Sequence, residues 1–133
     1  MLRIKKYFLT LVILALLILI NSCTLTLEEI LNNPKIVEEK CDKLKAIEDK
    51  NNCFTKYAEL VANDDSNISI NFCNNLNGAD RNKCIFNVFS ILETNNKIEE
   101  AINVCKNIDQ EGFFEWCESR RDRDSIVIAP SLE

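Results

Sequence analysis

Apolar residues recur at helical spacing in successive stretches between residues 34 and 122. Within each stretch they lie three or four positions apart, the period that lines one face of an α-helix. The pattern predicts an all-α domain of three stacked antiparallel helical hairpins, a short α-solenoid, over residues 34–63, 66–93 and 96–122. The expected buried faces hold Ile36, Val37, Lys40, Cys41, Leu44 and Ile47, then Cys53, Phe54, Tyr57, Ala58 and Val61, then Ile68, Phe72, Cys73 and Leu76, then Cys84, Ile85, Val88, Phe89 and Leu92, then Ile98, Ala101, Ile102, Cys105 and Ile108.

Several helix ends can be placed from local signals. Pro34 suits the first helical position, where its missing N–H costs nothing. The next helix is expected to begin near Asn51, with Asp49 or Asn51 as its cap. Before both, residues 23–33 form a tether and lead-in, in which Thr26 can cap a brief helix.

The hairpins differ in how apolar their second helices are. Residues 81–93 are apolar on much of the helix circumference, which favours burial at the centre of the core. In the last hairpin Arg120 and Arg121 replace the apolar residues of the earlier units. A polar ending is typical of a terminal repeat. Residues 123–133 are expected to be a short tail that either packs as an extended segment or stays disordered.

The N-terminus has the layout of a secretory signal. Arg3, Lys5 and Lys6 precede an apolar run from Phe8 to Ile20, interrupted only by Thr10. At 1.5 Å a residue this run spans about 20 Å, less than the roughly 30 Å of a hydrocarbon core. We therefore expect residues 1–22 to be a signal peptide and the protein to be exported.

The residues after this run, Asn21-Ser22-Cys23, resemble the lipobox of bacterial lipoproteins. In that family the cysteine is acylated and becomes the new N-terminus. Leu19 and Ser22 fit the pattern, whereas Asn21 departs from it. The resemblance implies lipidation of Cys23 and a place on the outer face of the cell membrane or in the periplasm. The alternatives are simple secretion and an uncleaved signal that serves as the anchor.

Seven cysteines are an odd number for an exported protein, and setting Cys23 aside leaves six. These six form three evenly spaced pairs, each followed three positions after its first cysteine by an aliphatic residue. The pairs are Cys41 and Cys53, Cys73 and Cys84, and Cys105 and Cys117, which lie 12, 11 and 12 positions apart.

Disulfides are the favoured use of these cysteines. The chain has no C-x-x-C knuckle and no histidine, which makes a zinc site or a Cys/His catalytic pair a poor alternative. Pairing within each hairpin uses all six cysteines. Pairing between hairpins, Cys53 with Cys73 and Cys84 with Cys105, is also regular but strands Cys41 and Cys117. The spacing favours the first scheme, which suits an oxidising compartment.

Successive first cysteines lie 32 positions apart, at 41, 73 and 105. Paired helices at this period resemble a tetratricopeptide-type or Sel1-type solenoid, but only in period. The tryptophan, glycine and proline positions of the tetratricopeptide pattern are missing. The resemblance to exported proteins with one cysteine pair per helical hairpin is closer, and it implies an architecture without a family active site.

Composition narrows the function. Without residues 1–22 the chain carries 13 Lys and Arg against 21 Asp and Glu, a net charge of −8. Such a chain repels phosphate backbones, so a nucleic-acid partner is not expected and a basic partner is favoured. No histidine is available as a general base or metal ligand, and no cofactor or metal is expected. We expect a non-enzymatic, membrane-tethered scaffold that binds a protein or peptide.

Two other functions stay open. One is a small exported inhibitor or immunity-type protein, which differs from the scaffold only in its partner. The other is a hydrolase that uses paired carboxylates. Its candidate residues are Glu38 with Glu39, Asp64 with Asp65, Glu99 with Glu100, and Asp122 with Asp124. Acidic residues in a first helical turn also have a structural explanation, because they complement the helix dipole.

A few single residues have two interpretations. Phe113, Phe114 and Trp116 are expected in the core of the last helix, with an exposed docking patch as the alternative. Arg120, Arg121 and Arg123 interleave with Asp122 and Asp124, which predicts a self-paired solvated helix end. Asn67-Ile68-Ser69 is a sequon, so Asn67 is a glycosylation site if the source organism glycosylates exported proteins.

Overall fold

The computed structural model describes residues 25–121 and 130–131, and these residues are helical with no strand among them. The prediction of an all-α fold is confirmed. The apolar N-terminal run, Cys23 and most of the tail lie outside the described residues. Across the part that is described, no helix is both long and apolar enough to cross a membrane. The helices are α2 (Leu27–Asn32), α3 (Lys35–Asp42), α4 (Ile47–Val61), α5 (Ser66–Cys73), α6 (Gly78–Thr94), α7 (Ile98–Cys105) and α8 (Phe113–Ser119).

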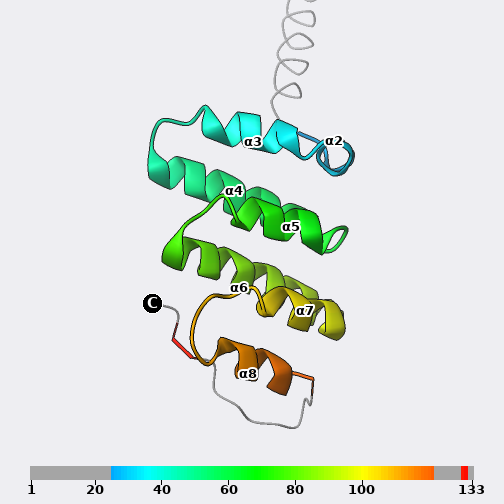
Figure 1. The fold of residues 1–133 in the computed structure, drawn as a ribbon. Coiled ribbons are helices and arrows are strands. Elements are labelled where there is room, and N and C mark those ends of the chain that lie inside the picture. The colour runs from blue at the N-terminus through cyan, green and yellow to red at the C-terminus, as the bar shows by residue number, and fades with distance from the viewer. Residues whose placement is uncertain (1–24, 122–129, 132–133) are drawn as a thin grey trace, which may run out of the picture.

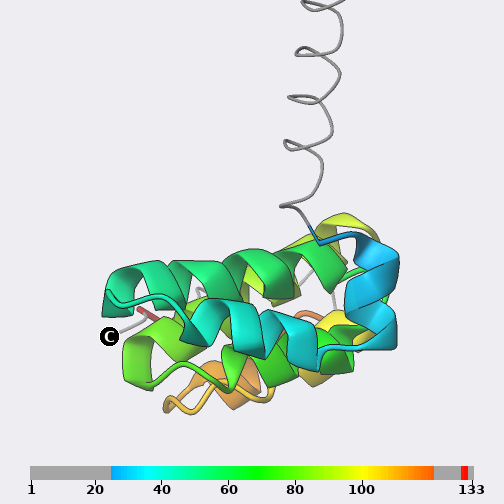
Figure 2. The same cartoon turned by 90° about the horizontal axis from the view of Figure 1, so that it is seen from above.

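The helices lie in successive layers, with α2 and α3 at one end of the molecule and α8 at the other (Figures 1 and 2). Helix α4 packs closely on α5, and α6 packs closely on α7. The two longest helices, α4 and α6, also contact each other. This contact places polar residues of the two helices side by side.

Helix α2 begins with the cap that the sequence predicts. The Thr26 side chain accepts a hydrogen bond from the Glu29 backbone N–H, and the Glu29 carboxylate accepts one from the Thr26 backbone N–H at 2.8 Å. This reciprocal arrangement is a capping box. Pro34 has helical dihedral angles and directly precedes α3, within one residue of its expected place.

The boundary between α3 and α4 differs from the prediction. Helix α3 ends at Asp42, and α4 begins at Ile47 instead of near Asn51. Its N-cap is Ala46, which makes no side-chain cap bond, so the caps expected at Asp49 or Asn51 are wrong. The polar residues after Ile47 continue the helix. No glycine or proline interrupts them, and in the helix they supply its solvated face and an acidic first turn.

The shifted boundary also changes which residues are buried. Leu44 and Ile47 were expected on the buried stripe, but they are 40% and 72% exposed. Leu76 and Ile108, the residues equivalent to Leu44 in the repeat, are buried. All three lie in the same backbone turn, in which the residue's N–H donates to the carbonyl of the preceding cysteine at 3.0–3.1 Å. The repeat is therefore kept in the backbone, while burial of its aliphatic residue is lost in the first unit.

Helix α6 contributes the most central part of the core. Cys84, Ile85, Val88 and Leu92 are fully buried, and Phe89 is 2% exposed. The helix contacts α4, α5 and α7, so its apolar sides meet neighbours in several directions. This agrees with the expectation drawn from its apolar circumference.

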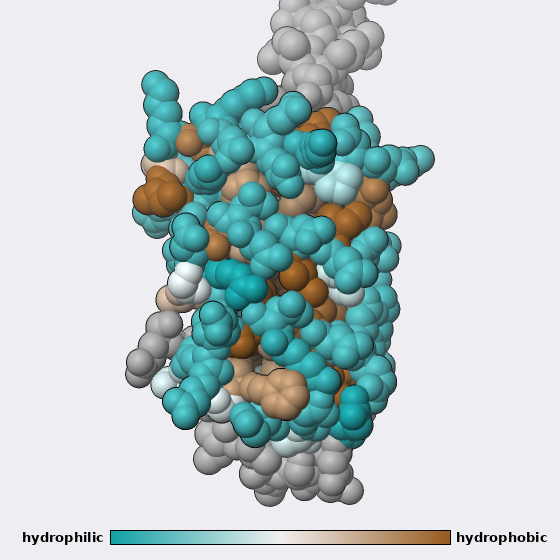
Figure 3. All heavy atoms as spheres, in the orientation of Figure 1, coloured by the Kyte–Doolittle hydropathy of each residue, from teal (hydrophilic) through white to brown (hydrophobic). Residues whose placement is uncertain are grey.

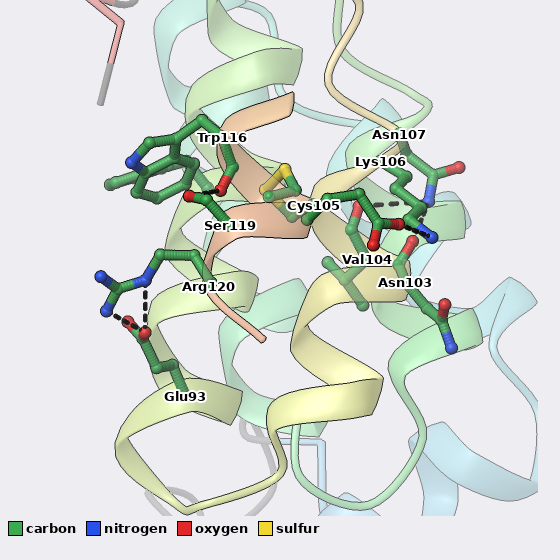
Figure 4. The surroundings of a disulfide bond; sticks show 12 residues. Glu93, Asn103, Val104, Cys105, Lys106, Asn107, Trp116, Ser119 and Arg120 are labelled. Carbon is green, nitrogen blue, oxygen red and sulfur yellow. Dashed lines mark hydrogen bonds and ion pairs between the residues drawn. A yellow bond between two sulfur atoms is a disulfide. The ribbon is translucent and has the colours of Figure 1, made fainter. Parts of the chain in front are cut away.

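Three disulfides join consecutive helices. They are Cys41–Cys53 between α3 and α4, Cys73–Cys84 between α5 and α6, and Cys105–Cys117 between α7 and α8, with Cα–Cα distances of 5.6, 5.6 and 5.8 Å. This is the pairing that the spacing favours. Figure 4 shows the third bond, with Cys105 lying close to Trp116 and Ser119. Five of the six cysteines are fully buried, so the bonds belong to the core.

Candidate functional site

A polar groove runs between α4 and α6. It has a volume of about 250 Å³ and is open to solvent. Apart from Cys84, every residue that lines it has a polar side chain. The lining residues are Asn51, Asn52 and Thr55 from α4 and Asp80, Lys83, Cys84 and Asn87 from α6. We refer to these seven residues as the α4–α6 groove.

The groove follows from helical periodicity. Asn51 and Thr55 are four positions apart on α4, and Asp80, Lys83 and Asn87 are three and four apart on α6. Each set therefore occupies one helix face. Adjoining positions of the same helices supply buried apolar residues to the core. When the two helices pack together, their polar faces must lie next to each other at the surface.

Two amide–carboxylate hydrogen bonds tie the groove walls together. Asn51 Nδ2 donates to Asp80 Oδ2 at 2.8 Å. At the other end, Asn87 Nδ2 donates to Glu59 Oε1 at 2.7 Å. Both bonds connect α4 with α6, and hydrogen bonds to an ionised acceptor are stronger than neutral ones. They hold the two helices at a fixed separation.

Three groove side chains remain available. Among the described residues, no hydrogen bond or ion pair engages the side chains of Asn52, Thr55 or Lys83. An amide both donates and accepts, a hydroxyl does the same, and an ammonium donates three hydrogen bonds. This set matches a ligand that presents alternating carbonyl and N–H groups, as a peptide backbone does.

Two other hollows have a larger volume. One, of about 320 Å³, is lined by Glu93, Asn96, Ile98 and Arg120. Its charged groups are already joined, because the Arg120 guanidinium binds the Glu93 carboxylate (Figure 4). The other, of about 540 Å³, lies along α2, where the Glu29 carboxylate is held in the capping box.

The carboxylate pairs considered for catalysis lie on separate elements. Glu38 and Glu39 are in α3, and Glu99 and Glu100 begin α7. Asp65 caps α5, its Oδ1 accepting from two backbone N–H groups at 3.0 and 3.1 Å. Asp122 and Asp124 lie outside the described residues. Within the described part of the chain, no group of three or more His, Cys, Asp or Glu side chains is placed to hold a metal ion.

The acidic residues of α7 bind neighbouring basic side chains. The Glu100 carboxylate lies 3.3 Å from Lys97 Nζ. Glu99 binds Arg121 at 2.8 Å and raises the pKa of that guanidinium. Exposed pairs of this kind stabilise a protein only slightly. They account for these two carboxylates without a catalytic role.

The arginines at the end of α8 have partners that the prediction did not include. Arg120 binds Glu93 at the end of α6, and Arg121 binds Glu99 on α7 and Glu118 on α8. The expected partners were Asp122 and Asp124, which lie with Arg123 outside the described residues. The arginines thus connect α8 with the two preceding helices. Spacing along one helix gives no sign of such long-range partners.

The aromatic residues of α8 divide between core and surface. Phe113 and Trp116 are 1% and 6% exposed, as expected for core residues. Trp116 contacts Phe86, Phe89 and Phe113 with ring centroids 5.2–5.8 Å apart. Phe114 differs from the core expectation, because it is 55% exposed beneath Lys106 Nζ. It lies on the outward side of α8, whose inward side buries Phe113 and Trp116.

The remaining candidate residues are spread over the chain. Asn67 is exposed at the second position of α5, so its side chain is accessible to modification. Cys23 and most of the 123–133 tail lie outside the described residues. Ser131, within the described part of that tail, accepts a hydrogen bond from Gln110 Nε2. Pro130 lies beside Gly112, and a Cβ atom added at Gly112 would lie 3.4 Å from the Cγ atom of Pro130.

The groove is the feature that sequence reasoning missed. Its signal was a polar edge, Asn51 and Thr55, directly beside the buried stripe that holds Phe54 and Ala58. One polar helix face does not reveal which other face it will meet. Comparison of the chain with protein-family models, with curated proteins and with solved structures gave no match.

Proposed function

We propose that this chain is an exported, membrane-tethered binding protein whose α4–α6 groove receives an extended peptide or protein segment without chemical turnover. The observation that carries the proposal is a groove with fixed walls and free Asn52, Thr55 and Lys83 side chains. Rigid walls reduce the ordering that binding requires, and this favours affinity. The free groups supply hydrogen bonds suited to a peptide backbone.

The architecture belongs to the same proposal. In this interpretation α3 with α4, α5 with α6, and α7 with α8 are three disulfide-closed hairpins stacked as a short solenoid. Solenoids expose long continuous surfaces, and they bind extended partners along them. The mature net charge of −8 favours a basic partner.

Export and tethering complete the proposal. The three disulfides are compatible with an oxidising compartment outside the cytoplasm. A lipid on Cys23 would hold the domain at the membrane, two residues before the first described residue. Binding is preferred to catalysis because Glu99 and Glu100 pair with basic side chains and Asp65 caps α5.

The groove is tested with the disulfide-intact fragment 24–133 and a random peptide display library. The affinity of a selected synthetic peptide is then measured by calorimetry for two variants. One combines Asn52→Ala, Thr55→Ala and Lys83→Ala, and the control combines Asn71→Ala with Asn103→Ala on α5 and α7. Losing one net hydrogen bond of about 1 kcal/mol weakens binding roughly fivefold, so we expect at least a tenfold loss for the groove variant.

The control should bind within about twofold of the unsubstituted fragment, because both of its asparagines are exposed away from the groove. Equal affinity for all three proteins would place the peptide elsewhere and overturn the groove assignment. Turnover of a substrate, lost when a Glu is replaced by Gln, would favour the hydrolase instead.

A further inference from the structure

The segment between α3 and α4 carries an unusual combination of side chains. We call residues Lys43–Ile47 the α3–α4 tip. It contains two of the four large hydrophobic residues that are exposed in the described part of the chain, Leu44 at 40% and Ile47 at 72%. Of these four, Ile47 is the most exposed. Contact with water alone gives no reason for two large apolar side chains to be exposed within one short segment.

Two lysines lie on either side of Leu44 and before Ile47. Lys43 and Lys45 are exposed, and neither makes an ion pair with any residue that the structure describes. Some other basic residues are paired, as Lys50 is with Asp42 at 2.6 Å and Arg120 is with Glu93. Exposed aliphatic groups between free lysines match a lipid surface, where apolar groups enter the headgroup region and ammonium groups meet phosphates.

The position of the tip favours the same partner. The α3–α4 tip lies at the end of the molecule that α2 and α3 form, opposite α8 (Figure 1). The description begins at Leu25, two residues after Cys23, and two extended residues reach about 7 Å at most. A lipid on Cys23 therefore brings this end of the molecule to the membrane. The tip lies about 12 Å further along, at the far end of the eight-residue α3.

From this placement we propose that the α3–α4 tip is a second membrane contact, which enters the headgroup region of the bilayer and orients the tethered domain with α8 outward. The inference rests on the tether in the proposed function. A weak contact is sufficient, because a short tether keeps the tip at an effective concentration on the order of millimolar. Figure 3 shows mostly hydrophilic residues on one face of the molecule, with separate hydrophobic patches.

The test uses the full-length lipidated protein in vesicles of phosphatidylcholine and phosphatidylglycerol that contain brominated lipid. The chain has a single tryptophan, so Trp116→Phe gives a silent background. Into it we place Ile47→Trp at the tip or Phe114→Trp at the opposite end. Phe114 is a matched control because it is also well exposed, at 55%. Bromine should quench Trp fluorescence at position 47 at least twofold more than at position 114.

Adding Lys43→Ser, Leu44→Ser and Lys45→Ser should lower the quenching at position 47 to the level of position 114. Flotation with the vesicles, loss of flotation in Cys23→Ala and the intact mass test the tether separately. A chain that floats with equal quenching at both positions overturns the tip contact and leaves the tether standing. A chain that does not float overturns the tether and the contact that rests on it. Quenching at position 47 that survives the triple substitution would mean that the tether alone brings this end to the lipid, and it would overturn the assignment of the contact to the tip side chains.

Discussion

One buried amide side chain, that of Asn82, holds a distant backbone segment in place. Asn82 on α6 is 7% exposed, and its side chain engages both backbone groups of Asp109. Its Oδ1 accepts from the Asp109 N–H at 3.2 Å, and its Nδ2 donates to the Asp109 carbonyl at 3.5 Å. One side chain thereby fixes the loop between α7 and α8 against α6.

Replacing this amide should destabilise the fold. In Asn82→Ala the two backbone groups of Asp109 lose their partner, which costs about 1–3 kcal/mol. For a domain of roughly 100 residues this corresponds to a melting temperature lower by several degrees. The control is Asn103→Ala, whose side chain is exposed on α7. Thermal unfolding by circular dichroism measures both, and an equal melting temperature for the two variants would contradict the role of Asn82.

Two surface carboxylates, those of Glu29 and Glu118, have pKa values below the ordinary one. Hydrogen bonds from Thr26, first from its backbone N–H, lower the pKa of Glu29 below its ordinary 4.5. A hydrogen bond from Lys106 lowers the pKa of Glu118 in the same way. Since the folded pKa is below the unfolded one, the stabilisation is complete above about pH 4.5. It is lost as the pH falls through the folded values.

Carboxyl NMR titration should therefore place the midpoints of both groups below 4.5. Lys106→Met removes the main cause of the shift at Glu118 and should raise its midpoint toward 4.5. Glu29 is the internal control, because its shift comes from Thr26 and should not change. A Glu118 midpoint that stays low in this variant would assign the shift to another neighbour.

At the scale of elements, α6 organises the core because its apolar residues meet helices on several sides. Phe89 is 2% exposed and contacts both Phe86 and Trp116, with ring centroids 5.7 and 5.2 Å apart. Close packing of this kind tolerates little loss of volume. Phe114 on α8 offers a comparison with the same side chain at the surface.

Phe89→Ala should lower the free energy of unfolding by about 3–5 kcal/mol, the usual cost of truncating a buried phenylalanine. Phe114→Ala should cost less than about 1 kcal/mol, because little apolar area leaves the core. Denaturant unfolding under non-reducing conditions measures both values. Similar losses in the two variants would mean that Phe114 is covered in solution, for example by a second copy of the chain.

At the scale of the whole molecule, the three disulfides join α3 to α4, α5 to α6 and α7 to α8. A molecule of thin helical layers buries a limited core, so cross-links contribute a large share of its stability. Closing a loop of about 12 residues is worth on the order of 3 kcal/mol by the chain-entropy estimate.

Peptide mapping of non-reduced protein should recover the pairs Cys41–Cys53, Cys73–Cys84 and Cys105–Cys117. Replacing Cys73 and Cys84 together by Ala should lower the free energy of unfolding by about 2–4 kcal/mol. Mass analysis after thiol alkylation provides the control for complete oxidation. Free thiols at Cys53 or Cys84 in the unsubstituted protein would contradict this scheme.

The helical class, the Thr26 cap, the central place of α6 and the cysteine pairs can all be predicted from the order of the residues. These properties depend on periodicity, capping chemistry and short separations along the chain, all of which are local. The folded arrangement was needed to show that Leu44 and Ile47 face solvent, that Arg120 binds Glu93, and that polar residues of α4 and α6 form a groove. These properties depend on which helix meets which. A stripe of side chains shows that a face exists, but its partner is chosen by packing in three dimensions.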